Sequence, residues 1–256
     1  MAKTEYGLQM YSVRDLTQVS LEEALKKVAE LGYKYIEFAG FFDNSAEDVK
    51  AWLDKYALVC SGTHTNVSEI LPETIDKTIA YHKTIGCKNL IVPGCDWSTP
   101  EKCDEVINSL NFASKKLAEN GIRLGYHNHS KEFMPTSDGI VFEDEVIKRT
   151  DAEIQVDTFW LFNAGIDVID YLNEHKDRIK VIHLKDGIPS ADSDKNYDHV
   201  HDNVIGLSLG DGKAPVAAIR EWALENNVLM VVESEGLDPT GIEEVERCIK
   251  YLRTLD

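Results

Sequence analysis

Two histidines and a glutamate lie close together near the middle of the chain: His127, His129 and Glu132, within the segment GYHNHSKE at residues 125–132. The segment follows residues 122–124, which we interpret as a strand. Imidazole and carboxylate groups are poor core material, because a buried polar group costs free energy unless it is paired. The same groups bind metal ions and transfer protons. We therefore expect a functional site where this strand ends.

Three further potential metal ligands close other apolar segments. Asp157, His183 and Glu233 each follow a run of aliphatic residues. Buried carboxylates are expensive unless they are paired or metal-bound, so these residues on neighbouring strands predict one divalent cation. Oxygen-rich ligation with one imidazole suits manganese, magnesium, cobalt or zinc, and the residue types do not rank these metals. The alternative is a set of hydrogen-bonded polar residues lining an unrelated pocket.

Lys185 is expected to act beside these ligands. It stands two residues after His183, so the two side chains face the same side while the strand persists. Its ammonium group would stabilise negative charge that develops on a substrate. The alternative is an ion pair with Asp186 at the surface.

Other polar and aromatic residues near strand ends are candidates for substrate binding. These candidates are Gln9, Tyr11, Glu37, His64 and Trp160. For His64 the alternative is a hydrogen-bonded loop histidine, and for Trp160 a core position. His199 and His201 lie in an acidic loop and resemble a surface metal-binding tract, although a mobile lid or solvated loop is favoured.

Hydrophobic periodicity divides the chain into eight strand-then-helix units. The predicted strands cover residues 8–12, 35–38, 58–63, 89–93, 122–124, 154–157, 180–184 and 228–233, and the helices cover 21–31, 46–56, 69–85, 100–120, 142–148, 167–174, 214–225 and 242–252. Ser20 and Glu23 form a capping box, and Pro100 suits the first helical position. A long polar loop is expected at 186–212.

Strands that alternate with helices indicate a parallel sheet, and eight such units predict a closed (β/α)8 TIM barrel. We expect one domain over residues 1–256. None of the strand-to-helix turns has the glycine pattern of a dinucleotide- or phosphate-binding loop. In such a barrel the carboxyl ends of the strands share one face, which would bring the candidate residues together.

Composition narrows the choice of partners. The formal charge of -18 repels phosphate backbones, so nucleic acid and anionic membranes are not expected as partners. The five cysteines are scattered, with no CxxC pair, which disfavours a disulfide framework. We find no signal segment and no run long enough to span a bilayer. A cytoplasmic location is therefore expected, and homo-oligomerisation is left open.

Six segments together resemble a known family. They are LQMYSVRD at 8–15, GYHNH at 125–129, VDTFW at 156–160, VIHLKD at 181–186, LGDG at 209–212 and VVE at 231–233. Their order and spacing resemble the sugar phosphate isomerase/epimerase family, the xylose isomerase-like TIM barrel group that also contains ketose 3-epimerases, inosose dehydratase and endonuclease IV.

The resemblance implies a divalent metal held by Glu, Asp, His and Glu from four strands. Asp157, His183 and Glu233 match three of these positions. The sequence departs from the family at the fifth strand, where a histidine stands near the position of the expected glutamate. Either His127 or His129 replaces the glutamate, or Glu132 reaches back from the loop, with Glu132 and His127 favoured.

The resemblance also implies an enzyme that acts on a small carbohydrate. The expected activity is that of a divalent-metal-dependent sugar isomerase or epimerase, which abstracts a proton next to a metal-bound carbonyl of a sugar or keto-sugar. The expected catalytic residues are Glu233, His127, His129 and Lys185. The alternatives are a lyase or hydratase of a 3-keto-glycoside or inosose, and a sugar-binding barrel without catalysis. An endonuclease is disfavoured by the acidic charge.

Overall fold

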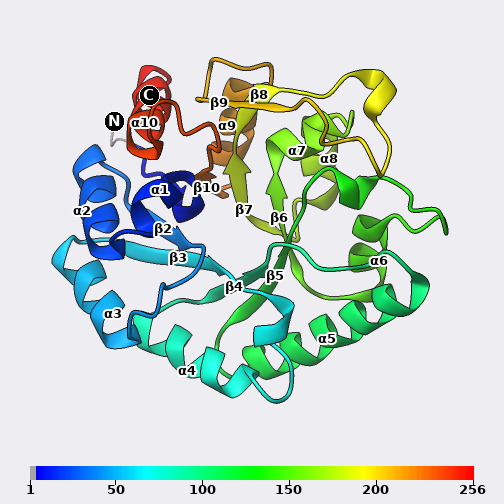
Figure 1. Ribbon diagram of the computed structural model, residues 1–256, viewed down its shortest axis with the longest axis horizontal. Coiled ribbons are helices and arrows are strands. Elements are labelled where there is room, and N and C mark those ends of the chain that lie inside the picture. Colours follow the sequence, from blue (N-terminus) through cyan, green and yellow to red (C-terminus); the bar gives the residue numbers. More distant parts are fainter. Residues whose placement is uncertain (1–3) are drawn as a thin grey trace.

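The computed structural model describes residues 4–256, and its strands form a closed parallel barrel with the order β1-β10-β7-β6-β5-β4-β3-β2. The barrel strands are β1 (Gly7–Gln9), β2 (Tyr35–Phe38), β3 (Val59–His64), β4 (Asn89–Val92), β5 (Arg123–His127), β6 (Glu153–Asp157), β7 (Ile179–Leu184) and β10 (Leu229–Val232). Figure 1 shows these strands at the centre, with the helices around them. The predicted TIM barrel is confirmed.

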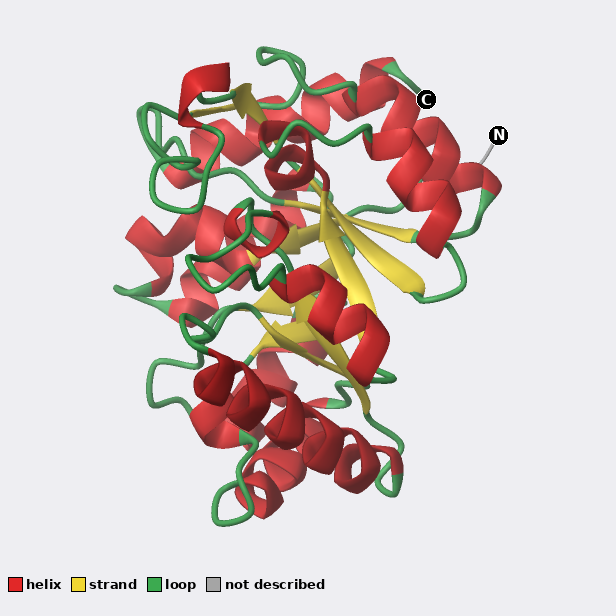
Figure 2. Ribbon diagram, turned by 90° about the vertical axis from the view of Figure 1, so that its right-hand side faces the viewer, coloured by secondary structure: helices red, strands yellow, loops and turns green. Residues whose placement is uncertain are grey.

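The helices follow the strands along the chain and cover the outside of the barrel (Figure 2). They are α1 (Arg14–Thr17), α2 (Leu21–Leu31), α3 (Ala46–Lys55), α4 (Ile75–Ile85), α5 (Pro100–Ala118), α6 (Phe142–Arg149), α7 (Thr158–Asn163), α8 (Val168–His175), α9 (Val216–Glu225) and α10 (Gly241–Thr254). Ser20 caps α2 as predicted, since its hydroxyl accepts the Glu23 backbone N–H at 3.2 Å. Among the described residues, no helix is both long and apolar enough to cross a membrane.

Alternation along the strands separates an apolar layer from a polar interior. Leu8, Ile36, Val156 and Ile182 are buried in the layer between strands and helices. Their chain neighbours Gln9, Glu37, Gln155 and His183 point the other way and hydrogen-bond to one another inside the barrel. Because side chains alternate with a period of two, the same strands build the core and position the polar groups.

Four element predictions needed correction. The first strand ends at Gln9, and residues 10–13 form the 3-10 helix η1 (Met10–Val13). The helix predicted from 69 begins at Ile75, because Pro72 disfavours a helical conformation in the residue before it. The predicted loop 186–212 contains an antiparallel pair, β8 (Asp186–Ile188) and β9 (Ile205–Leu207). The short helix α7 was not predicted, because six residues are too few for a periodic pattern.

Candidate active site

Four potential metal ligands meet at the carboxyl ends of four adjacent strands. They are His127 of β5, Asp157 of β6, His183 of β7 and Glu233, which directly follows β10. Their ligand atoms all lie within 4.8 Å of one another, and all four side chains are buried. The register explains part of this closeness, since Asp157 stands opposite His183 in the pairing of β6 with β7.

Asp157 provides the strongest sign that this group suits a cation. Its Oδ1 accepts the backbone N–H groups of Phe159 and Trp160 at 3.0 and 2.9 Å, which caps α7. Its Oδ2 is buried and has no hydrogen-bond partner. A buried carboxylate oxygen is normally paired, so this atom has room for a ligand bond. Two imidazoles and two carboxylates fit a divalent transition metal or zinc.

His183 is fixed between two carboxylates. Its Nε2 lies 2.6 Å from Oε1 of Glu37, and its Nδ1 lies 2.7 Å from Oε2 of Glu233. Burial alone would lower the pKa of His183, but the two glutamates outweigh burial and raise the pKa to about 10. The Nε2 bond to Glu37 orients the ring so that Nδ1 faces the ligand group, where a cation would replace the proton that Nδ1 shares with Glu233.

His127 is held in the form that a metal ligand requires. Oε1 of Gln155 lies 3.1 Å from Nδ1 of His127, which leaves Nε2 with its lone pair. Burial, followed by the neighbouring His183 and His64, lowers the pKa of His127 well below its usual value. His127 is therefore neutral near pH 7.

Gln155 was not among the sequence candidates. Its Nε2 donates to Glu37 at 2.6 Å, while its Oε1 also lies 2.8 Å from Nε2 of His64. The available signal was its place two residues before Asp157, which puts both side chains on the interior face of β6. A second group of three potential ligands, His64, His127 and His183, shares this environment.

Lys185 is buried beside the ligand group, with 1% of its surface exposed. Its ammonium nitrogen lies 2.5 Å from Oε1 of Glu235, 3.9 Å from Oδ2 of Asp157 and 4.5 Å from the ring centre of Trp160. The alternative of a surface ion pair with Asp186 is wrong. The Asp186 carboxylate instead accepts backbone N–H groups, including those of residues 187, 210, 212 and 214.

Glu132 lies outside the four-residue group. Its Oε2 accepts the backbone N–H of His129 at 2.9 Å, and its Oε1 accepts the hydroxyl of Tyr126 at 3.2 Å. Burial would lower the pKa of His129, but Glu132 outweighs burial and raises it. Of the three alternatives for the fourth ligand, His127 is the one whose nitrogen lies with Asp157, His183 and Glu233.

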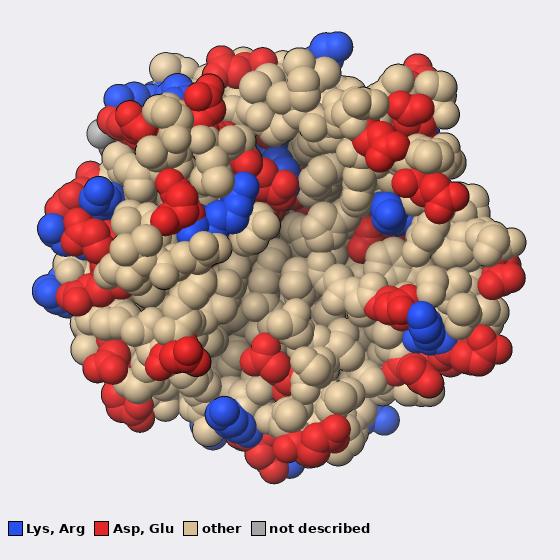
Figure 3. Space-filling view, viewed as in Figure 1, with Lys and Arg blue, Asp and Glu red and all other residues tan. Residues whose placement is uncertain are grey.

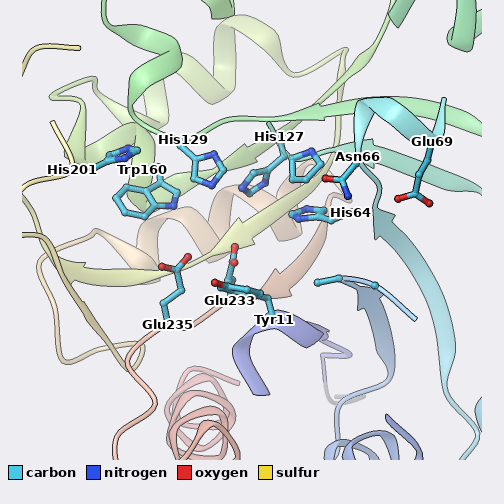
Figure 4. Close-up of a pocket in the computed structure, with 13 residues that line it drawn as sticks. Tyr11, His64, Asn66, Glu69, His127, His129, Trp160, His201, Glu233 and Glu235 are labelled. Atoms are coloured by element: carbon cyan, nitrogen blue, oxygen red, sulfur yellow. The ribbon is translucent and has the colours of Figure 1, made fainter. Parts of the chain in front are cut away.

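The ligand group opens into a cavity of about 480 Å³ at the mouth of the barrel. Figure 3 shows the molecule hollowed at the centre of this face, and Figure 4 is a close-up of the side chains that line the hollow. The cavity is lined by Tyr11, Ala39, Gly40, His64, Asn66, Glu69, Pro93, His127, His129, Trp160, His201, Glu233 and Glu235.

Three of the five predicted substrate-binding residues therefore face this space: Tyr11, His64 and Trp160. Gln9 and Glu37 lie beneath it instead. Their side chains are fully buried and hydrogen-bonded to each other at 2.8 Å. Asn66 and Glu69 line the cavity without having been selected from the sequence, because their places depend on how the loops fold. Glu235, which stands near the end of the last strand but was given no role, lines it as well.

Comparison with known proteins agrees with the class that the fold and the site define, a TIM barrel with its polar site at the strand ends. The chain matches the family described as "Xylose isomerase-like TIM barrel" over residues 25–255. A sugar phosphate isomerase/epimerase structure from Parabacteroides distasonis superposes with a TM-score of 0.79 at 25% identity, covering 97% of each chain. The chain belongs to the xylose isomerase-like TIM barrel family, as expected from the sequence.

Two curated relatives are named after enzymatic reactions, in line with the expected enzyme. A Geobacillus kaustophilus protein named inosose dehydratase is 25% identical over 195 residues, which are 64% of this chain and 61% of that relative. A Haemophilus influenzae protein named 2-oxo-tetronate isomerase is 24% identical over 216 residues, which are 73% of this chain and 83% of that relative. The chain thus spans less than two thirds of the first relative's length.

Proposed function

We propose that the chain is a divalent-metal-dependent isomerase or epimerase of a sugar or keto-sugar. The observation that carries this proposal is the unpartnered Oδ2 of Asp157 within the buried group that it forms with His127, His183 and Glu233. One buried carboxylate, that of Glu233, and two buried imidazoles, those of His127 and His183, surround this unpaired oxygen. Such a group suits a bound cation better than a purely hydrogen-bonded pocket.

The ligand set favours some metals over others. Imidazole nitrogens suit zinc and other transition metals, whereas magnesium prefers oxygen ligands and water. A set with His127 and His183 beside Asp157 and Glu233 therefore favours manganese, cobalt or zinc over magnesium. When bound, the cation supplies a Lewis acid that polarises a substrate carbonyl and acidifies the adjacent C–H.

The chain's own residues supply a base and an acid on opposite sides of the cavity. Figure 4 shows Glu233 and His129 facing each other across this space. Burial would raise the pKa of Glu233, but Lys185 and His183 outweigh burial and hold it well below the usual range, so this carboxylate is ionised. His129, whose pKa Glu132 raises, carries the proton more readily than a free imidazole. Because both side chains line the cavity, Glu233 is placed to remove a proton and His129 to deliver one.

A lyase is the second candidate, and the Lys185–Glu235 pair favours it. Dehydration requires a base beside the carbonyl and an acid that protonates the departing hydroxyl. Glu235 lines the cavity and lies 2.5 Å from the buried Lys185 ammonium, so it can relay the Lys185 proton to a departing hydroxyl, which leaves as water. A dehydratase or hydratase acting on an inosose or a 3-keto-glycoside would use this pair, and a relative named inosose dehydratase supports the candidate.

Proton exchange in deuterated water tests the proposal and separates the candidates. The purified protein is incubated with scyllo-inosose, keto-hexoses and 3-keto-glucosides, with and without added Mn²⁺, and followed by NMR. We expect exchange of the proton beside the carbonyl, and a loss of at least about 100-fold in Asp157→Asn, whose metal content also falls. A product with inverted configuration at the carbon beside the carbonyl identifies an epimerase, and a product that has lost water identifies a lyase.

The remaining outcomes of that experiment contradict the proposal. Binding of a sugar without exchange of any proton supports a sugar-binding barrel instead. Full metal content in Asp157→Asn would contradict the assignment of Asp157 as a metal ligand. A matched control is Asp167→Asn, which changes the exposed N-cap of α8 and leaves the site intact.

The setting of this activity is also a proposal. We propose a single domain that works in the reducing cytoplasm on a small carbohydrate and does not bind nucleic acid. All five cysteines are free and four of them are buried, as expected for cysteines that serve as small apolar residues. Acidic side chains are widespread on the face around the cavity (Figure 3), which opposes contact with a phosphate backbone.

A further inference from the structure

Trp160 has an unused hydrogen-bond donor at the wall of the cavity. The side chain lines the cavity and is 8% exposed, yet its indole Nε1 is buried without a partner. Its backbone is fixed, because Asp157 accepts its N–H and Ser130 donates to its carbonyl at 2.7 Å. Its ring packs against His129, His201 and the Lys185 ammonium. A rigid buried N–H without an acceptor costs free energy that a ligand oxygen would recover.

His201 has an unused nitrogen next to that donor. Its ring centre lies 4.8 Å from that of Trp160 and 6.3 Å from that of His129. Its Nε2 is buried and has no partner either. Burial, followed by the neighbouring His129 and Lys131, lowers the pKa of His201 to about 4, so the ring is neutral near pH 7. A neutral imidazole offers one donor and one acceptor.

The loop that carries His201 is anchored at this point. Its neighbour Val200 is fully buried, and the Val200 carbonyl accepts the side-chain amide of Asn163 at 2.8 Å. The same amide group also donates to Ser130, which holds Trp160. The loop between β8 and β9 therefore holds His201 at a defined position in the cavity lining. The sequence had instead favoured a mobile lid or solvated loop for this segment.

We propose that Trp160 and His201 form a subsite for a hydroxyl group of an uncharged sugar or cyclitol, at the end of the substrate that lies away from the metal-ligand group. This inference rests on the proposed function and specifies its substrate class. A hydroxyl both accepts and donates, so one hydroxyl can accept from the Trp160 N–H and donate to the His201 nitrogen.

The charges around the cavity explain why the substrate is uncharged. Three carboxylates, Glu69, Glu233 and Glu235, line it, and among the described residues no lysine or arginine does. Lys185 lies beneath the lining and is already engaged by Glu235. The N-terminus of α7, which could bind a phosphate, is capped by Asp157. A phosphorylated sugar would therefore meet repulsion and no compensating donor cluster.

Equilibrium binding tests this assignment without requiring turnover. The probes are scyllo-inosose, D-fructose and D-fructose 6-phosphate, measured by calorimetry with the metal-loaded protein. We expect at least one neutral probe to bind, and D-fructose 6-phosphate to bind more weakly than D-fructose by about tenfold or more. His201→Ala and Trp160→Phe should each weaken binding of the neutral probe by about fivefold to tenfold, with metal content unchanged.

His199→Ala is the matched control. His199 belongs to the same loop, but its side chain is 61% exposed and bonds to Asp202, so the change should leave binding unaltered. An equal loss in both histidine variants, or tighter binding of the phosphorylated sugar, overturns the subsite. Failure of every neutral probe to bind also overturns it, while the proposed metal ligands are judged separately by the metal content of the same samples.

Discussion

Glu37 lies beneath the candidate metal ligands and contacts four neighbouring polar side chains. It accepts hydrogen bonds from Gln9 and Gln155 and lies 2.6 Å from His183 and 3.1 Å from His64. Burial would raise its pKa, but His183 and His64 outweigh burial and hold the pKa well below the usual range. Glu37 is thus an ionised carboxylate that orients ligands, and not a group that faces the cavity.

At the residue scale, we predict that Lys185→Met lowers kcat by about 100-fold or more on the substrate found by proton exchange. The change keeps an unbranched side chain of similar length and removes the positive charge that lies 3.9 Å from Asp157 and 2.5 Å from Glu235. Metal content should be retained. The control is Lys180→Met, at an exposed position of β7, the strand that Lys185 directly follows. Equal kcat values for Lys185→Met and the wild type would contradict the role.

The residues that sequence reasoning found are those that end apolar strands. Asp157, His183 and Glu233 stand out because a charged or imidazole group follows several aliphatic residues, and the structure brings them together. Gln155 and His201 could not be found in the same way. Gln155 is an amide within a strand, and the contact between His201 and Trp160 depends on the path of a loop.

At the element scale, α6 contains a buried acid that should make stability depend on pH. Glu143 is 2% exposed; its Oε1 accepts the hydroxyl of Tyr171 in α8 at 2.5 Å, and its Oε2 has no partner. Burial is the main reason why its pKa rises from 4.5 to about 7. Between these two values the unfolded chain releases the proton while the folded protein keeps it. The free energy of unfolding therefore falls as the pH rises through this window.

We predict that Glu143→Gln removes this pH dependence. The difference in unfolding free energy, variant minus wild type, should increase by about 3 kcal/mol between pH 4.5 and pH 7, since each pKa unit corresponds to about 1.4 kcal/mol. Urea unfolding at a series of pH values measures the difference. The control is Glu145→Gln on the same helix, where Glu145 forms a solvent-accessible ion pair with Arg149. This variant should show no such trend. Parallel curves for wild type and Glu143→Gln would refute the assignment.

The elements themselves were largely predictable, because local signals mark them. Ser20 accepts the expected N-cap hydrogen bond, Pro100 begins α5 as expected, and Gly32 ends α2 with φ of 93°. The pairing of β8 with β9 was missed because it joins residues on both sides of a long polar loop. Short elements such as α7 depend on tertiary contacts, here the capping of its first turn by Asp157.

At the scale of the whole molecule, closure of the barrel creates the site. β1 pairs with β10 and β2, which joins the two ends of the sheet and sets all eight strand ends around one cavity. The count of strand-helix units predicted this closure, and the alternation of side chains predicted which residues would face inward. The choice among His127, His129 and Glu132 was not predictable, since it depends on where residues after the strand turn.

The position of a bound cation tests the proposed metal ligands. Crystals of the protein grown with Mn²⁺ and measured for anomalous scattering would locate it. We predict one peak bounded by His127, Asp157, His183 and Glu233, with ligand distances of about 2.0 to 2.3 Å. A peak among His64, His127 and His183 alone, a peak at Glu132, or no peak at saturating Mn²⁺ would contradict the proposed metal ligands.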